Sequence, residues 1–151
     1  MISLITLPND GDIVMSLVKM PKWYSRRRYM IQSDILYKVM FNGEGVIDAH
    51  IGNGFVTDFA STPRVLWWLL QPTGRCAAAG LLHDWCYEYG TLNIRRDGLP
   101  LCAVTRAQAD KLLRDGVVLA GCRRATAWAM WAAVRMFGWL HWKGGKNGRH
   151  D

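Results

Sequence analysis

The sequence lacks several features that would place it in a special class of protein. The N-terminus has no basic flank followed by an apolar run, so we do not expect a signal peptide. We expect instead that the protein is made in the cytoplasm. Internal repeats and low-complexity stretches are also missing, which argues against solenoid and fibrous folds. The few cysteines include no C-x-x-C pair and are expected to be reduced thiols, with a bridge between two of them as the alternative: Cys76, Cys86, Cys102 and Cys122.

Acidic residues are also scarce relative to basic ones. The chain has 12 Asp and Glu against 19 Lys and Arg, a net charge of +7. This excess favours anionic partners, namely nucleic acid, anionic lipid, a cell-wall polymer or an acidic neighbour in an assembly. With 151 residues, half of them apolar, the chain is long enough for one globular domain. We expect that domain at residues 1–142 and a flexible, glycine-rich tail at 143–151.

Strands are expected in the first part of the chain, over about residues 10–60. Branched and aromatic residues are concentrated at 13–18, 35–41 and 46–51. The Asn-Gly-Glu-Gly sequence at 42–45 is a turn signal that joins the last two of these segments. The pattern therefore predicts a small antiparallel sheet.

Helices are expected from about residue 64 to 142. Three segments have helical periodicity and suitable end residues: 75–89, 105–120 and 123–140, the last broken or ended near Gly138. Thr105 and Gln108 have the spacing of a capping box at the start of the second helix. Residues 93–100 are expected to form a polar loop. The fold class predicted is α+β, with an N-terminal antiparallel sheet followed by three helices.

Polar side chains interrupt the apolar faces of the first two predicted helices. His83, Asp84 and Tyr87 lie along one stripe of the first helix, and Asp110 begins a core-facing stripe of the second. A buried carboxylate must be hydrogen-bonded, paired or bound to a metal. Antiparallel packing of the two helices would bring Asp110 to His83 and Tyr87, where it would orient the imidazole as a general base. The alternative is a buried structural network without chemistry.

A glycine-containing segment before the helices is the second candidate site. Gly52 and Gly54 would let backbone groups approach a ligand, and Asp58 and Ser61 follow as small polar residues. Asp58 and Asp84 together could provide oxygen ligands for a hard cation. The alternative is a loop between sheet and helix in which Asp58 or Ser61 caps the next segment.

Tryptophan is abundant, with eight in the chain, and several lie in the last predicted helix. Trp128, Trp131 and Trp139 at helical spacing are typical of a core face. A helix that lies on a membrane surface is the alternative, because tryptophan suits an interface. The segment is too short, and interrupted by Arg135, for a membrane span.

Three short motifs occur in an order that resembles an uncharacterised domain family common in tailed bacteriophages and prophages. They are Gly54-Phe55-x-Thr57-Asp58-x-Ala60-Ser61-x-Pro63, His83-Asp84-x-x-Tyr87 and Arg106-x-x-Ala109-Asp110. The resemblance covers about residues 35–140. It implies a phage or prophage origin and a virion, lysis or host-interaction protein. Arg106, which begins the third motif, is a further candidate site residue.

The sequence His83-Asp84-Trp85-Cys86-Tyr87 is similar to the H-D-x-C-Y helix of secreted phospholipase A2. The resemblance implies that His83 is the general base for an attacking water and that Asp84 binds calcium. It also implies that Asp110 orients His83, that Tyr87 braces Asp110, and that the loop at 52–58 stands where that family has its calcium loop.

Three classes of function follow from these observations. The first is a metal-assisted hydrolase of phage origin, with calcium or zinc held by Asp84 and Asp58, acting on phospholipid esters or, as a second choice, peptidoglycan. The second is a non-catalytic virion or accessory protein whose His–Asp–Tyr cluster is a core network. The partners expected are a membrane or cell-envelope surface or other virion subunits. Nucleic-acid binding is third, because the arginine clusters accompany no recognition motif.

Overall fold

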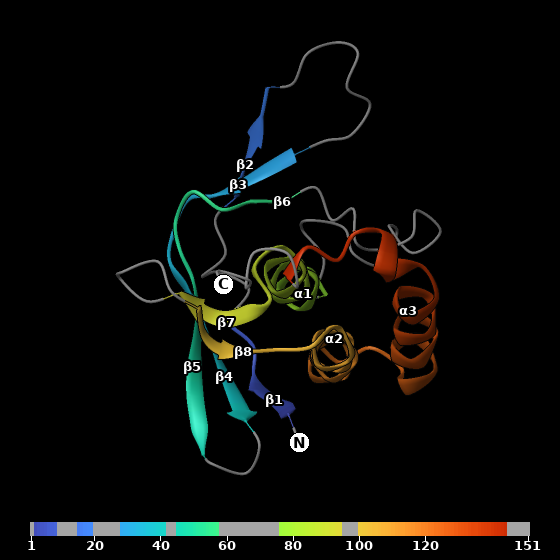
Figure 1. Cartoon of the computed structure of the whole chain (residues 1–151). Helices are drawn as coiled ribbons and strands as arrows, with labels where there is room; N and C mark the ends of the chain where they lie inside the picture. The colour runs from blue at the N-terminus through green and yellow to red at the C-terminus, as the bar shows by residue number, and fades with distance from the viewer. Residues whose placement is uncertain are drawn as a thin grey trace.

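The structure, a computed structural model, describes residues 2–8, 15–19, 28–41, 45–57, 76–94 and 100–144. It confirms the α+β class, with antiparallel strands and three helices (Figure 1). The strands are β1 (Ile2–Thr6), β2 (Met15–Val18), β3 (Arg28–Ile31), β4 (Ile35–Phe41), β5 (Val46–Ile51), β6 (Val56–Thr57), β7 (Thr91–Ile94) and β8 (Pro100–Ala103). The helices of the described residues are α1 (Ala77–Tyr89), α2 (Arg106–Leu119), α3 (Arg124–Phe137) and a short 3-10 helix, η2 (Gly138–Leu140).

The main sheet has the strand order β1-β4-β5, with both pairs antiparallel. The predicted pairing of the second and third strands is confirmed, with Ile35 opposite Ile51. Alternate side chains of β4, including Ile35, Tyr37 and Val39, are buried, while those between them are exposed. This alternation is what a sheet with one face covered by helices requires. Tyr37 also donates a hydrogen bond to the Ala78 carbonyl of α1 at 2.9 Å.

Three expectations about the strands need correction. The main sheet begins at Ile2, earlier than residue 10, because β1 pairs with the distant β4. Residues 93–100 are not simply a loop, since β7 and β8 form an antiparallel hairpin whose strands include both ends of that range. A second small sheet, β2-β3-β6, stands apart from the main one at the top of Figure 1, where one sheet was expected.

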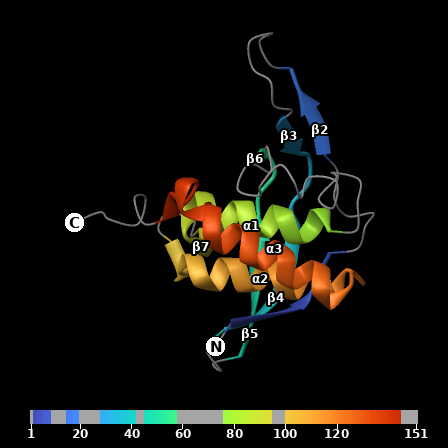
Figure 2. The same ribbon diagram turned by 90° about the vertical axis from the view of Figure 1, so that its right-hand side faces the viewer.

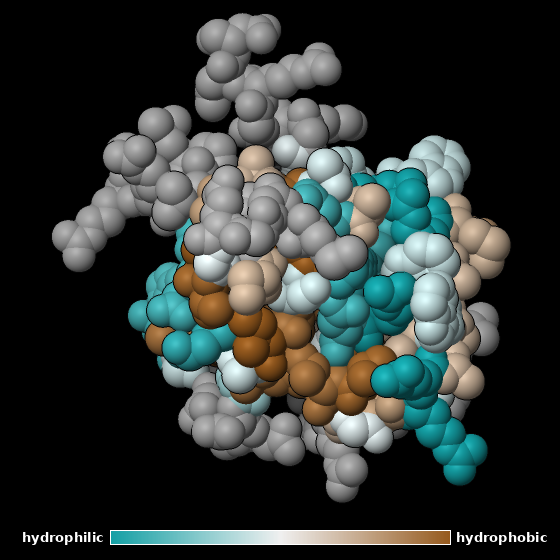
Figure 3. Space-filling view, turned by 90° about the horizontal axis from the view of Figure 1, so that it is seen from below, coloured by the Kyte–Doolittle hydropathy of each residue, from teal (hydrophilic) through white to brown (hydrophobic). Residues whose placement is uncertain are grey.

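The three helices form two layers on one side of the main sheet. In Figure 1 α1 and α2 lie next to the strands, and α3 lies outside them. Figure 2, turned to face α3, shows it crossing in front of α1 and α2 with the strands behind. One cluster of buried side chains includes residues from all three helices, among them Ala79, Leu113, Val117 and Met130. The underside in Figure 3 shows apolar side chains reaching the surface between hydrophilic ones.

The helix ends follow the sequence signals closely. The Thr105 side chain accepts a hydrogen bond from the Gln108 backbone, and the Gln108 side chain accepts one from the Thr105 backbone, so the predicted capping box is confirmed. Gly90 ends α1 in the left-handed conformation, with φ of 67°. The last helix breaks at Gly138, as expected, and continues as η2.

The residues after η2 bear on the predicted tail. Lys143 donates its backbone N–H to the Tyr87 carbonyl at 2.9 Å, and its ammonium group lies 3.0 Å from Glu88. Gly144 lies against Gly90. The first two residues of the predicted tail therefore contact the end of α1, and the rest of it, 145–151, lies outside the described residues.

Gly116 lets α2 approach α1 closely. A Cβ atom at this position would lie 2.6 Å from the Cβ atom of Ala79 and 3.1 Å from Leu4 Cδ2. We expect Gly116→Ala to lower the free energy of unfolding by about 1 kcal/mol, because overpacking costs about 1–3 kcal/mol and exceeds the gain in helix propensity of about 1 kcal/mol. Denaturant unfolding measures the change.

Gly52→Ala is the matched control, because nothing lies within 4 Å of a Cβ atom placed there. It should change the free energy of unfolding by less than about 0.5 kcal/mol. A Gly116→Ala protein as stable as the control would show that α1 and α2 are not in this close contact.

Candidate active site

The antiparallel pair α1 and α2 brings together His83, Tyr87 and Asp110. His83 Nε2 lies 3.1 Å from Asp110 Oδ1, and the Tyr87 hydroxyl donates to the same oxygen at 2.5 Å. His83 and Asp110 are both 0% exposed. The predicted convergence of these three side chains on two helices is confirmed.

Arg135 of α3 completes the surroundings of Asp110. Its Nη1 atom donates to Asp110 Oδ2 at 3.0 Å, so each carboxylate oxygen has at least one donor. Arg106, a predicted site residue, donates to the Arg135 carbonyl at 3.1 Å and so supports this arrangement from the first turn of α2. The sequence analysis missed Arg135 as a site residue. Its signal was a charged residue in the last turn of a helix that is otherwise apolar after Arg124 and Thr126.

Gly138 makes room for the Tyr87 hydroxyl. A Cβ atom at Gly138 would collide with the hydroxyl oxygen and lie 3.1 Å from two carbons of the ring. The Tyr87 ring packs against His83, with ring centroids 4.1 Å apart, and lies nearly perpendicular to the Trp142 ring, with centroids 5.2 Å apart. The end of α3 and the residues after η2 therefore hold Tyr87 in place to donate to Asp110.

A second carboxylate lies on the opposite side of the imidazole. Asp84 Oδ1 is 3.9 Å from His83 Nδ1, and the Asp84 side chain is 10% exposed. Thr57 of β6 donates its hydroxyl to Asp84 Oδ2. Thr57 was not among the predicted site residues, although it belongs to the first of the three motifs and directly precedes Asp58. The imidazole thus lies between two carboxylates, Asp110 of α2 on one side and Asp84, bonded to Thr57 of β6, on the other.

The charges of the site alter its pKa values in a consistent way. Burial disfavours the imidazolium form of His83, but Asp110 and Asp84 outweigh it and raise the pKa of His83 above 6.5. Burial also opposes ionisation of Asp110, but hydrogen bonds with His83, Tyr87 and Arg135 lower its pKa below 3.8. Burial and the neighbouring Asp110 raise the pKa of Tyr87. Near neutral pH Asp110 is therefore ionised and Tyr87 keeps its proton.

The glycine-containing segment is described only in part. Gly54 adopts φ of 89° and donates its N–H to the Ile31 carbonyl at 2.8 Å, while Gly52 accepts from Phe55 at 3.4 Å. Asp58 and Ser61 lie outside the described residues. Among the side chains that the structure does describe, no three His, Cys, Asp or Glu residues are grouped to hold a metal ion. The cation site at Asp84 and Asp58 stays a prediction.

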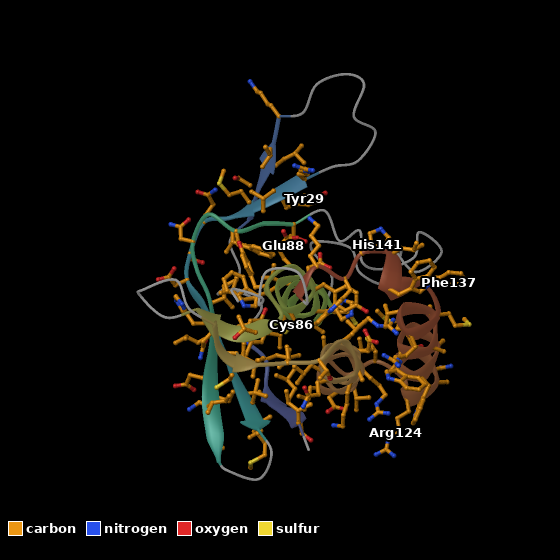
Figure 4. The ribbon with its side chains drawn as sticks, in the orientation of Figure 1. Tyr29, Cys86, Glu88, Arg124, Phe137 and His141 are labelled. Carbon is orange, nitrogen blue, oxygen red and sulfur yellow. The ribbon has the colours of Figure 1, made fainter. Side chains whose placement is uncertain are left out.

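Gly54 also borders a surface pocket of about 410 Å³. Figure 4 shows Glu88 on the side of α1 that faces β3 and β6, where this pocket lies. Its charged lining residues are Arg28, Glu88 and Lys143. Neither His83 nor Asp110 lines this pocket, so Gly54 borders a surface that the buried pair of His83 and Asp110 does not reach.

The comparisons with known proteins identify the family of the chain. Residues 29–134 match the family described as "Protein of unknown function (DUF1353)". The chain belongs to this family. The matched range contains His83, Asp84, Tyr87 and Asp110, whereas Arg135, Gly138 and Trp142 lie beyond its end. No curated protein and no solved structure matches significantly.

Among the described helices of this family member, none is long and apolar enough to cross a membrane.

The tryptophan-containing helix, α3, has one buried face and one exposed face. Ala127, Met130 and Val134 of α3 are buried, whereas Trp128 is 52% exposed. These three residues form the face toward α2, whereas Trp139 is 63% exposed and Trp131 is only partly buried. The prediction that the tryptophans form a core face is therefore wrong, and the membrane-surface alternative stays a prediction.

Replacing Asp110 tests the electrostatic description of the site. In Asp110→Asn we expect the pKa of His83 to fall below its wild-type value, because the carboxylate that stabilises the imidazolium is gone. Titration of the histidine ring protons by NMR measures it. Asp34→Asn is the control, because Asp34 lies beside the exposed His50 on β5. An unchanged His83 pKa in Asp110→Asn would contradict the description.

The same pair should make stability depend on pH. The contribution of protonated His83 is complete below its unfolded pKa of 6.5 and is lost as pH rises through its higher folded pKa. The contribution of ionised Asp110 is complete above 3.8 and is lost as pH falls through its lower folded pKa. The stability difference between wild type and Asp110→Asn should therefore be largest between pH 3.8 and pH 6.5, where both contributions are complete.

Proposed function

We propose that this protein is a hydrolase of phage origin in which His83 activates water and Asp110 orients the imidazole. The observation that carries the proposal is the 3.1 Å contact between His83 Nε2 and Asp110 Oδ1 in a fully buried setting. A carboxylate on one nitrogen fixes the tautomer and stabilises the imidazolium, which leaves the other nitrogen to accept a proton. Structural ion pairs also perturb pKa values, so measurements of turnover distinguish a catalytic His83 from a structural one.

The reaction that this arrangement supports is hydrolysis of an ester. Water attacks the carbonyl carbon while its proton passes to Nδ1 of His83, and Asp110 compensates the positive charge on the ring. The intermediate then collapses, the bond to the alcohol oxygen breaks, and the imidazolium returns its proton to that oxygen. Tyr87 and Arg135 keep Asp110 in position through their hydrogen bonds.

Exposed apolar side chains support a lipid ester as the substrate. The end of α3 and η2 carry large side chains that are more than half exposed: Met136, Phe137, Trp139 and Leu140. Figure 4 shows Phe137 on the outer side of the molecule. Such a group, with the net charge of +7, suits contact with an anionic membrane surface. Peptidoglycan is the second substrate class, because a cationic protein also suits an anionic cell wall.

Complete burial of His83 favours a second candidate, a non-catalytic virion or accessory protein. In that protein the ionised Asp110, held by three side chains, serves to fix the helices relative to one another. The two candidates differ in what removal of the imidazole does. Loss of turnover with little loss of stability supports the hydrolase, and loss of stability without any turnover to lose supports the structural protein.

Replacing His83 is the direct test of the hydrolase. We expect His83→Gln to lower ester hydrolysis about 10²- to 10⁴-fold, the usual contribution of a general base. Release of fatty acid from phospholipid vesicles is measured with calcium, with zinc and with EDTA, since Asp84 and Asp58 are proposed to hold a divalent cation. Peptidoglycan turbidity assays run in parallel under the same conditions.

His50→Gln is the matched control, because His50 lies exposed on β5 next to Asp34 and should leave turnover unchanged. Thermal melting of each variant separates unfolding from loss of chemistry. Equal turnover in wild type and His83→Gln, or no turnover with any metal, would refute the proposal.

The pH dependence of turnover provides an independent check. A general base acts in its neutral form, so kcat/KM should rise with pH through a pKa above 6.5. In Asp110→Asn the same limb should move to lower pH while the plateau falls, because Asp110 raises the pKa of His83. A limb in the same position in both proteins would show that another group is titrating.

A further inference from the structure

Two cysteines that are far apart in sequence meet at one end of the helix pair. Cys76 directly precedes α1, and Cys122 lies in the turn between α2 and α3. Their Sγ atoms are 2.7 Å apart, although 46 residues separate them along the chain. Cys76 is 2% exposed, and Cys122 is partly exposed. The antiparallel packing of α1 against α2 is what brings the start of one helix to the end of the other.

The backbone on both sides of this pair is held in place. Cys122 donates its N–H to the Val117 carbonyl at 3.2 Å, after a turn in which Gly121 has φ of 83°. Cys76 accepts a hydrogen bond from Gly80 at 3.1 Å and belongs to the core cluster that includes Val117. The two sulfur atoms therefore do not meet by movement of exposed loops, because regular backbone structure and core packing set their positions.

We propose that Cys76 and Cys122 form a disulfide bond when the protein meets an oxidising environment. The reaction is thiol–disulfide exchange with a disulfide donor such as oxidised glutathione. One cysteine attacks the donor and releases one thiol, and the second cysteine then displaces the other thiol. Both protein thiols lose their protons and together two electrons, and the donor disulfide is reduced to two thiols.

The other two cysteines have no such arrangement. Cys86 is completely buried in the main core, and Cys102 lies on β8. Within the described parts of the chain, which include all four cysteines, Cys76 and Cys122 are the sulfur pair in contact. One specific bond is therefore expected, leaving Cys86 and Cys102 as thiols.

Burial determines how the bond can form. It raises the pKa of the Cys76 thiol to about 12, so little reactive thiolate exists there in the folded protein. Cys122, the more exposed of the two, is the thiol that a disulfide donor reaches first. Exchange should be slow in the folded protein and faster during folding, before Cys76 is buried.

The bond would connect the two helices that carry His83 and Asp110. It closes a loop that contains both residues, since His83 follows Cys76 and Asp110 precedes Cys122. A crosslink over a loop of this length restricts the unfolded chain and should raise the melting temperature by on the order of 10 °C. The inference does not depend on the proposed hydrolase activity, because a structural protein would gain the same stability.

Mapping of the crosslink tests the proposal. The protein is refolded with reduced and oxidised glutathione, its free thiols are blocked with iodoacetamide, and it is digested with trypsin without reduction. We expect residues 76–95 to be joined to residues 115–123, and reduction to separate them. Because residues 76–95 also contain Cys86, the digest is repeated with Cys86→Ser, which should retain the crosslink.

Thermal melting with and without dithiothreitol provides the second measurement. Dithiothreitol should lower the melting temperature of wild type and of the control Cys102→Ser by similar amounts, and leave Cys122→Ser unchanged. Four blocked cysteines after refolding, or a crosslink between any other pair, would overturn the proposal. If Cys122→Ser does not fold, the peptide map of wild type and Cys86→Ser still decides.

Discussion

The buried carboxylate of Asp110 is the constraint on which the arrangement of the helices depends. A charge with no exposure is costly unless it is paired and hydrogen-bonded. Its donors are His83 and Tyr87 from α1 and Arg135 from α3, so the residue on α2 can be satisfied only when three helices are correctly placed. Hydrophobic contacts hold these helices together, and Asp110 specifies their relative positions.

The same network bears on both candidate functions. As a structural element, it makes incorrect helix packing unfavourable, because a shift of α1 or of α3 removes at least one donor from the buried Asp110 carboxylate. As a catalytic element, it holds His83 in one orientation and raises its pKa toward the pH at which general bases are effective. Asp84, bonded to Thr57 of β6, connects the opposite side of the imidazole to the second sheet. The chemistry would therefore occur where sheet and helices meet.

Much of the fold followed from local patterns. The periodicity of β4 and β5 and the capping box at Thr105 are properties of neighbouring residues, and the structure confirms them. β1 and the hairpin of β7 and β8 were missed. β1 is short and forms because it pairs with residues near position 40. The polar residues between β7 and β8 are typical of a loop, so the strands on either side of them were not predicted. Pairing of distant strands leaves little trace in a short segment.

The candidate site divides in the same way. The sequence by itself determined that His83 and Tyr87 share a helix face and that Asp110 begins a core-facing stripe, because the period of a helix sets both. Only the tertiary structure decided that Arg135 and Thr57 join them and that Cys76 meets Cys122. Each of these contacts links residues on different elements, and their distance depends on how helices and strands pack, which no local period encodes.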